Sequence, residues 1–324
     1  MPTDHITLAN FLAQQPKQPL ASLLLTIADT VKTIAAMTAK GALAGVIDKL
    51  QSQNVQGETQ MQLDVLSNQA FISSLEASGL VAGLVSEEMD EVYPVTEGAP
   101  LLTVFDPLDG SSNVAVNVSV GSIFSVLSAP DYLQSGSKQI AAGYAIYGPS
   151  TMLVLTLGAG SHGFTLDPDS QQFILTHPSI QIAPEASEFA INASNERFWE
   201  PPAQRYISEC KAGKTGARGK DFNMRWIASM VADVHRILMR GGIYMYPKDS
   251  KDPGKAGRLR LMYEANPMSF IVEQAGGASS TGRLRMLEVM PEHIHQRVPV
   301  IMGSRSEVER VCRYYTEYDA EGGS

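Results

Sequence analysis

Cysteine is nearly absent from this chain. Only Cys210 and Cys312 occur among 324 residues, far apart and in no spacing typical of a metal site. Two such thiols cannot build the disulfide framework of a small secreted domain, and they do not match the clustered pairs of a zinc site. We therefore expect two buried, reduced thiols in a cytoplasmic protein.

The sequence also lacks signs of targeting. The first twelve residues include Asp4 and have neither the basic start nor the apolar core of a signal peptide. No run approaches the ~20 apolar residues that a membrane span requires. The chain is expected to be soluble and untargeted.

Positive charge is in deficit, because 25 Lys and Arg residues stand against 34 Asp and Glu residues, for a net charge of -9. The summed field of such a chain repels nucleic acid and anionic membranes, so we expect neither as a partner. Local cations would have to recruit an anionic substrate.

The hydrophobic content of 44% and charged content of 18% are ordinary for a folded protein, and the length exceeds one comfortable core. Residues 119–176 hold short β-rich stretches separated by turn residues, which predicts an antiparallel meander. A polar connector with prolines follows, so we place a domain boundary near 180, between domains of residues 1–180 and 181–324.

The remaining pattern mixes helices and strands in both halves. Periodicity predicts one or two packed helices over 20–50, with an interruption near Gly41. Further elements are predicted as helices at 63–75, 224–240 and 262–275, strands at 80–86, 100–105, 241–247 and 298–303, and a terminal helix.

Acidic residues recur where these elements end or begin. Glu87 and Glu88 follow one strand, Asp106 and Asp109 follow the next, and Glu264 lies near a helix start. If they converge, two carboxylates ~4 Å apart at an effective dielectric of ~20 repel by ~4 kcal/mol, so the cluster needs a counter-charge. Oxygen ligands alone favour magnesium or manganese over zinc.

The stretch "VFDPLDGSSN" at 104–113 places backbone carbonyl and N–H groups next to these acids. A turn between the aspartates would expose the carbonyl of Leu108 to a metal. Gly110 permits close approach of a ligand, and the N–H groups of Ser111 and Ser112 could then face a phosphate. The ordinary alternative for a bare DxxDG is an Asx turn with a serine cap.

With "SEE" upstream and "GRLRLMYEANPMSFIVEQAGG" downstream, "DPLDGSSN" closely resembles class I fructose-1,6-bisphosphatases. The segments at 54–68, 229–238 and 241–247 match the family in the same order, so the resemblance spans nearly the whole chain. It implies a layered α/β fold (αβαβα) with a metal-binding N-terminal domain, a sugar-phosphate-binding C-terminal domain and a site in the cleft between them.

The resemblance also implies roles for the acids. Asp64, with Glu88, would orient and deprotonate the attacking water. Considered without the resemblance, Asp64 is more simply an acid at a helix N-terminus, where the helix dipole favours negative charge. Two or more Mg²⁺ ions, with Mn²⁺ as a substitute, would be held by Glu87, Asp106, Leu108, Asp109, Glu264 and Glu58.

Substrate contacts follow by the same resemblance. Asn192 and Tyr246 would hold the distal phosphate, Arg258 stands where many relatives have lysine, and Arg260 would lie near the reacting phosphate. Arg225 would reach into a neighbouring subunit's site, which implies a homotetramer. The alternative for each arginine is simple solvation at the surface. The full expected set of substrate contacts is Asp109, Gly110, Ser111, Ser112, Asn192, Arg225, Tyr246, Arg258 and Arg260.

Some positions depart from the family pattern. Val114–Ala115 replaces the Ile-Asp that commonly follows "SSN", and Trp226 stands where many relatives have tyrosine. Pro100–Leu101 stands where AMP-inhibited relatives have Lys-Tyr, so we expect weak or absent AMP inhibition at the usual site.

The resemblance implies Mg²⁺-dependent hydrolysis of fructose 1,6-bisphosphate to fructose 6-phosphate and phosphate, in gluconeogenesis. One alternative is sedoheptulose 1,7-bisphosphate, alone or as a second substrate. Another is a non-catalytic sugar-phosphate binder, which the persistence of Asp64 and of the proposed metal acids disfavours.

Overall fold

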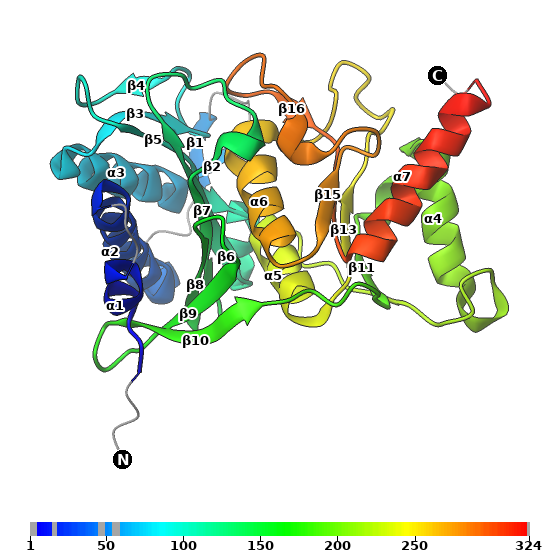
Figure 1. Ribbon diagram of the computed structural model, residues 1–324, viewed down its shortest axis with the longest axis horizontal. Coiled ribbons are helices and arrows are strands. Elements are labelled where there is room, and N and C mark those ends of the chain that lie inside the picture. Colours follow the sequence, from blue (N-terminus) through cyan, green and yellow to red (C-terminus); the bar gives the residue numbers. More distant parts are fainter. Residues whose placement is uncertain (1–4, 15–17, 45–48, 54–58, 323–324) are drawn as a thin grey trace.

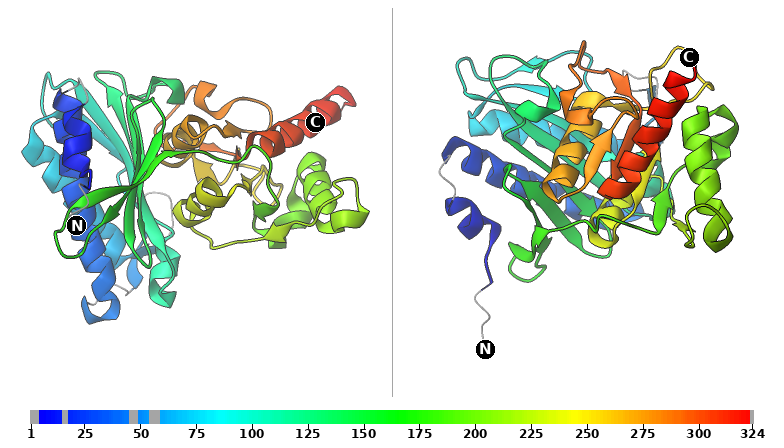
Figure 2. Two further views of the ribbon diagram at one scale, coloured as in Figure 1. Left: turned by 60° about the horizontal axis from the view of Figure 1, so that its bottom comes forward. Right: turned by 45° about the vertical axis from the view of Figure 1, so that its right-hand side comes forward.

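The computed structural model describes residues 5–14, 18–44, 49–53 and 59–322. Sheets and helices alternate across it in five layers, which confirms the αβαβα expectation (Figures 1 and 2). One helical layer contains α1, α2 and α3, the middle layer α5 and α6, and the last layer α4 and α7. The helices are α1 (Leu8–Ala13), α2 (Gln18–Lys40), α3 (Gln62–Ser78), α4 (Pro201–Ala212), α5 (Met230–Arg240), α6 (Asn266–Gln274) and α7 (Arg305–Ala320).

The first sheet has eight strands in the order β10-β9-β8-β7-β6-β5-β3-β4. Its neighbours pair antiparallel except β3 and β5, which are parallel, so both of these strands run toward the same edge. The predicted meander over 119–176 forms β6 to β10. The strands are β3 (Val81–Ser86), β4 (Tyr93–Pro94), β5 (Leu101–Asp109), β6 (Val120–Ser128), β7 (Ala141–Tyr147), β8 (Thr151–Thr156), β9 (Ser161–Leu166) and β10 (Phe173–Ile180).

The second sheet has five strands in the order β12-β11-β13-β17-β15. Two strand pairs, β1 with β2 and β14 with β16, lie outside both large sheets. The division at residue 180 stays a prediction. The remaining strands are β1 (Lys49–Gln53), β2 (Thr59–Met61), β11 (Glu188–Ala190), β12 (Asn223–Met224), β13 (Ile243–Tyr246), β14 (Leu259–Arg260), β15 (Ala278–Ser280), β16 (Arg297–Val298) and β17 (Val300–Gly303).

Helix α2 corrects one expectation from the sequence. Its residues Pro19–Lys40 are long and apolar enough, by length and composition, to cross a membrane, with a mean hydropathy of 1.5. Apolar residues on one face, among them Leu23, Ile27, Val31 and Ile34, are fully buried in the core cluster that also contains α3 and the first sheet. The apolarity of this helix is therefore accounted for by packing against the sheet and α3.

Three predicted boundaries differ from the structure. Strand β5 does not stop before Asp106 but continues through Asp109. The helix expected from 224 begins only at Met230, because Ser229 caps it by accepting a hydrogen bond from the Ala232 N–H. A π-helical turn, Leu261–Ala265, precedes α6.

The expectation of two buried thiols holds for Cys210, whereas Cys312 is only partly buried.

Candidate active site

A cavity of about 380 Å³ lies where the ends of β3 and β5 meet the start of α5, β13 and the π-helical turn. It therefore draws on both halves of the chain. Its lining residues are Asp64, Glu87, Glu88, Asp106, Leu108, Asp109, Gly110, Ser111, Ser112, Asn192, Trp226, Ala228, Met230, Tyr244, Tyr246, Leu259, Arg260 and Glu264.

The two aspartates of "DPLD" reach this cavity through an irregularity in β5. Asp106 pairs with Ile123 of β6, but Asp109 pairs with Gly121, so three steps on β5 oppose two on β6. In a regular strand, residues three apart point to opposite faces, and an extra residue re-aims the side chain. The bulge thus allows both carboxylates to face one cavity. It replaces the turn that we expected between them.

The start of helix α5 holds Asp109 in place at the cavity wall. The Ser229 hydroxyl donates to Oδ2 of Asp109 at 2.6 Å. The backbone N–H groups of Met230 and Val231 donate to the same carboxylate at 3.2 and 2.8 Å. A carboxylate at a helix N-terminus is stabilised by the unpaired N–H groups there. Asp109 is therefore fixed by an element 120 residues away in the chain.

Three buried carboxylates converge beside this anchor. Oxygen atoms of Asp106, Asp109 and Glu264 all lie within 4.8 Å of one another. Burial raises the pKa of all three, and it raises that of Glu264 to about 8. Such a cluster is unfavourable when ionised unless a cation compensates it. Buried oxygen donors at this spacing fit a hard divalent cation.

Arg260 provides the protein's own positive charge at the cluster. Its guanidinium lies 2.7 Å from Oε1 of Glu87 and 3.8 Å from Oε2 of Glu264. Its backbone N–H also donates to Glu264 at 2.6 Å. One arginine therefore ties the acid after β3 to the acid of the π-helical turn.

Asp64 and Glu88 line the same cavity. Asp64 accepts a hydrogen bond from the Met61 backbone N–H at 2.7 Å, as a first-turn acid of α3 does. Burial, opposed in part by that hydrogen bond, raises its pKa to about 7, with Glu88 and Glu87 adding to the rise. Asp64 is therefore both an acid at the N-terminus of α3 and a residue of the cavity lining.

The segment after β5 has a shape that requires glycine. Gly110 has φ of +76°, and a Cβ there would lie 2.6 Å from Cβ of Ser229. Ser111 and Ser112 open a short 3-10 helix, Ser111–Val116, and also line the cavity. The close approach of Gly110 to Ser229 brings the loop and α5 together.

Aromatic side chains form part of the cavity wall. Trp226 stacks on Tyr244 with an interplanar angle of 7° and meets Tyr246 edge-on at a centroid distance of 6.0 Å. Asn192 lies beside Tyr246, and both residues line the cavity. The departure at Trp226 thus lies in the cavity wall itself.

Two of the expected residues that the structure describes, Arg258 and Arg225, are not part of the lining. Arg258 pairs with Asp249 through two hydrogen bonds of 3.0 and 3.1 Å, next to Tyr246. Arg225 is exposed and donates to the Met224 carbonyl at 2.9 Å. Glu58 lies outside the described residues.

Sequence patterns did not indicate the lining residues that come from α5, β13 and β14. Met230, Tyr244 and Leu259 line the cavity without having been proposed. Asp233 accepts hydrogen bonds from the backbone N–H groups of Ile227 and Ala228 and so fixes the turn before α5. A serine followed by an apolar run signals a helix cap, but nothing local indicates that this cap meets Asp109.

Comparison with known families covers nearly the whole chain. Residues 6–178 match the model of the fructose-1,6-bisphosphatase N-terminal domain, and residues 182–316 match that of the C-terminal domain.

Individual proteins agree with these matches. The chain is 56% identical over 321 residues to the class 1 fructose-1,6-bisphosphatase of Acinetobacter baumannii strain SDF, covering 96% of this chain and 99% of that protein. It is 56% identical over 333 residues to that of Rhodospirillum rubrum, covering 97% and 94%. The structure is similar to the holo form of Leishmania major fructose-1,6-bisphosphatase, with a TM-score of 0.91, 40% identity and coverage of 98% and 100%.

Proposed function

The chain belongs to the fructose-1,6-bisphosphatase family and hydrolyses fructose 1,6-bisphosphate, and we propose that the cavity just described is where it does so. The observation that carries this proposal is the convergence of Asp106, Asp109 and Glu264 within 4.8 Å, beside Asp64. The named relatives are fructose-1,6-bisphosphatases, so they favour this substrate over the sedoheptulose alternative.

The family is metal-dependent, and we propose that the metal here is Mg²⁺. Asp106, Asp109 and Glu264 would hold it, with Glu87, the Leu108 carbonyl and Glu58 as the further ligands that the family resemblance implies. When bound, Mg²⁺ neutralises phosphoryl oxygens and lowers the pKa of water.

The chain's own groups orient the reaction. Asp64 and Glu88 lie on one wall, where they would hold the attacking water and accept its proton. A carboxyl with a pKa of about 7 is suited to proton transfer near neutral pH. Burial of the cluster keeps bulk water from screening the charges that meet the phosphate.

The reacting phosphate would be held by the Gly110, Ser111 and Ser112 segment, with Arg260 beside it. At the other end of the cavity, Asn192 and Tyr246 would contact the distal phosphate, with Arg258 next to Tyr246. The aromatic wall that includes Trp226 would then face the sugar. With these placements, a substrate fits only if its two phosphates are spaced so that each reaches its own group of residues.

We further propose that the protein works as a cytoplasmic homotetramer. Arg225 supports shared sites, since its side chain is exposed and does not line the cavity of its own chain. Sedimentation of the wild type should give the mass of four chains. Arg225→Ala should raise KM with little change in kcat if the residue completes a neighbour's site.

The proposed function is tested by phosphate release from fructose 1,6-bisphosphate. We expect release with Mg²⁺ and none after EDTA treatment. Asp64→Asn should lower kcat by roughly 10² to 10⁴-fold, the usual contribution of a general base. Asp29→Asn, at an acid on α2 whose side chain is 73% exposed, is the matched control and should keep wild-type activity. Wild-type kcat in Asp64→Asn would count against the assigned base.

A further inference from the structure

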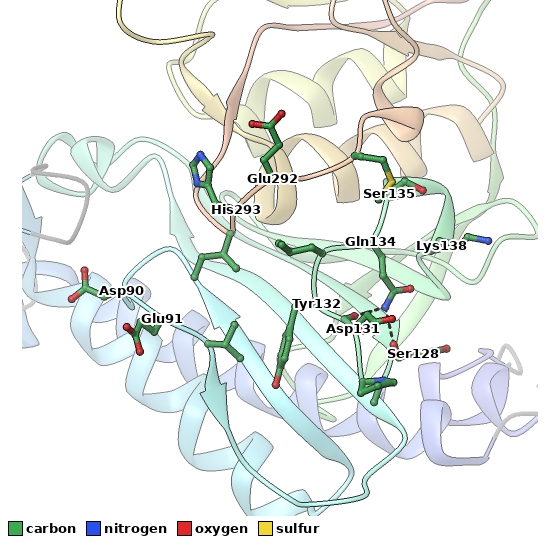
Figure 3. Close-up of a pocket in the computed structure, with 16 residues that line it drawn as sticks. Asp90, Glu91, Ser128, Asp131, Tyr132, Gln134, Ser135, Lys138, Glu292 and His293 are labelled. Atoms are coloured by element: carbon green, nitrogen blue, oxygen red, sulfur yellow. Dashed lines mark hydrogen bonds between the residues drawn. The ribbon is translucent and has the colours of Figure 1, made fainter.

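A second and larger cavity, of about 1000 Å³, lies apart from the active-site cavity and shares no lining residue with it. Three segments build it: residues 90–92 between β3 and β4, residues 128–135 after β6, and residues 290–294 before β16. Figure 3 shows these segments meeting around Tyr132. We call this cavity the Tyr132 groove.

The floor of the Tyr132 groove is apolar and well anchored. Val92, Tyr132 and Ile294 are partly buried and pack on a core cluster that includes Tyr263. A Cβ at position 83 would collide with the Tyr132 hydroxyl, so Gly83 of β3 is what lets this ring lie against the sheet. The floor is therefore part of the folded core.

The mouth of the groove leaves apolar surface uncovered. Met290 is 60% exposed and Leu133 is 40% exposed, and both line the groove. Large apolar side chains that gather in a concave site mark a ligand surface more often than isolated ones do. The apolar lining thus favours a ligand that has an apolar portion.

The charged groups of the lining are mainly negative. Four exposed acids stand against Lys138, the only lysine or arginine of the lining. In the part of the chain that the structure describes, none of the four forms an ion pair. Figure 3 shows acids on both sides of Tyr132. These acids are Asp90, Glu91, Asp131 and Glu292.

We propose that the Tyr132 groove is a regulatory binding site for an aliphatic polyamine. Such a molecule carries ammonium groups separated by apolar methylene chains. The methylene chains would lie on Val92, Tyr132 and Ile294, and the ammonium groups would meet the carboxylates on either side. A nucleotide or sugar phosphate does not fit, since four carboxylates repel an anion more strongly than Lys138 attracts it.

The walls of the groove connect it to the active site. Asp90 follows Glu87 by three residues and Glu88 by two along the chain. On the other wall, His295, next to Ile294, hydrogen-bonds through Nδ1 to the Tyr263 hydroxyl at 2.9 Å. Tyr263 directly precedes Glu264. A ligand that draws the two walls together therefore acts on segments that carry active-site acids.

The test is calorimetric titration of the full-length protein with spermidine at fixed ionic strength. We expect saturable binding that weakens with salt, because the contacts are ionic and exposed. The double variant Asp90→Asn/Glu292→Gln should raise the Kd for spermidine roughly tenfold, as expected for the loss of two exposed ion pairs. Asp169→Asn, at an exposed acid in the turn between β9 and β10, is the control and should bind as the wild type does.

Kinetics of fructose 1,6-bisphosphate hydrolysis complete the test. Spermidine should change kcat or KM in the wild type and in Asp169→Asn, but not in the double variant at the same concentration. Equal spermidine affinity in wild type and double variant would overturn the site. Spermidine binding that leaves kcat and KM unchanged would overturn its regulatory role. If a basic amphipathic peptide of lysine and leucine binds and spermidine does not, the proposal of a polyamine ligand is overturned and the groove is assigned to a protein partner.

Discussion

The hydroxyl of Ser229 lies 2.6 Å from Oδ2 of Asp109 and also accepts a hydrogen bond from the Ala232 N–H at 3.3 Å. One side chain therefore caps α5 and holds a proposed metal ligand at the end of β5. Because of this double contact, the start of α5 and the acidic cluster cannot move independently.

We expect Ser229→Ala to lower both stability and activity. The loss of an N-cap and of a hydrogen bond to a buried carboxylate should reduce the free energy of unfolding by about 1–3 kcal/mol. Activity should fall as well, because Asp109 loses a fixed partner. Chemical denaturation and steady-state kinetics measure the two effects.

Thr7→Ala is the matched control for that variant. Thr7 caps α1 by accepting a hydrogen bond from the Asn10 N–H at 3.1 Å, outside the active-site cavity. This control should lose about 1 kcal/mol of stability and keep wild-type kcat. A Ser229→Ala enzyme with full activity would show that the contact with Asp109 is not needed for catalysis.

The effect of pH on stability should reveal the cost of the acidic cluster. In the metal-free protein, burial raises the pKa of Asp64 to about 7 and of Glu264 to about 8, from ordinary values of 3.8 and 4.5. The folded state then binds more protons than the unfolded state between these limits. The free energy of unfolding therefore falls as pH rises from about 4 to about 8, and the loss is complete only above the raised pKa values.

Mg²⁺ should remove that cost, so the increase in Tm on adding Mg²⁺ should be larger at about pH 9 than at about pH 6, by at least about 3 °C. Glu264→Gln should reduce the difference between the two pH values. Glu288→Gln, at a side chain that is 64% exposed, should leave it as in the wild type. An equal Tm increase at both pH values in the wild type would contradict this prediction.

Arg260 should be critical for the metal-free fold. Its guanidinium is buried between Glu87 and Glu264. Arg260→Gln leaves buried carboxylates without their cation, which typically costs about 3–5 kcal/mol. Mg²⁺ should restore part of this loss.

The control for Arg260 is Arg313→Gln, at an arginine whose side chain is 55% exposed and which lies 3.7 Å from Glu317. Such a surface pair should contribute less than about 1 kcal/mol. Thermal unfolding with and without Mg²⁺ compares the two variants. Similar losses in both would mean that Arg260 does not balance the cluster.

Tyr246→Phe should affect substrate binding more than chemistry. The variant keeps the aromatic wall but removes the hydroxyl beside Asn192, in the part of the cavity assigned to the distal phosphate. We expect KM to rise by roughly fivefold to tenfold with kcat little changed, since this contact is made equally in ground and transition states. Tyr93→Phe, which removes an exposed hydroxyl bonded to Glu76, is the control. A fall in kcat without a change in KM would contradict this assignment.

Much of the lining of the candidate site could be predicted from the sequence because its acids lie in short local motifs. The "DPLDG" stretch, Glu87 and Glu264 each stand next to an apolar element, and the parallel pairing of β3 and β5 brings two of these motifs to one edge. The meander after residue 119 was predictable for the same reason, since each of its strands is bounded by turn residues.

The rest depends on contacts between distant residues. No local pattern indicates that Ser229 meets Asp109, or that β5 continues through Asp109 with a bulge. The late start of α5 follows from that contact, because Ser229 caps the helix and faces Asp109 at once. The apolar composition of α2 shows a related limit, since a buried core helix and a membrane span have similar composition.

We propose that the buried acids of this cavity bind a hard divalent cation. Electron paramagnetic resonance of Mn²⁺, titrated into the metal-free protein, measures this binding directly. We expect saturable Mn²⁺ binding to the wild type and to Glu288→Gln, and a loss of at least one bound ion in Glu264→Gln. Equal Mn²⁺ binding by Glu264→Gln and wild type would contradict it.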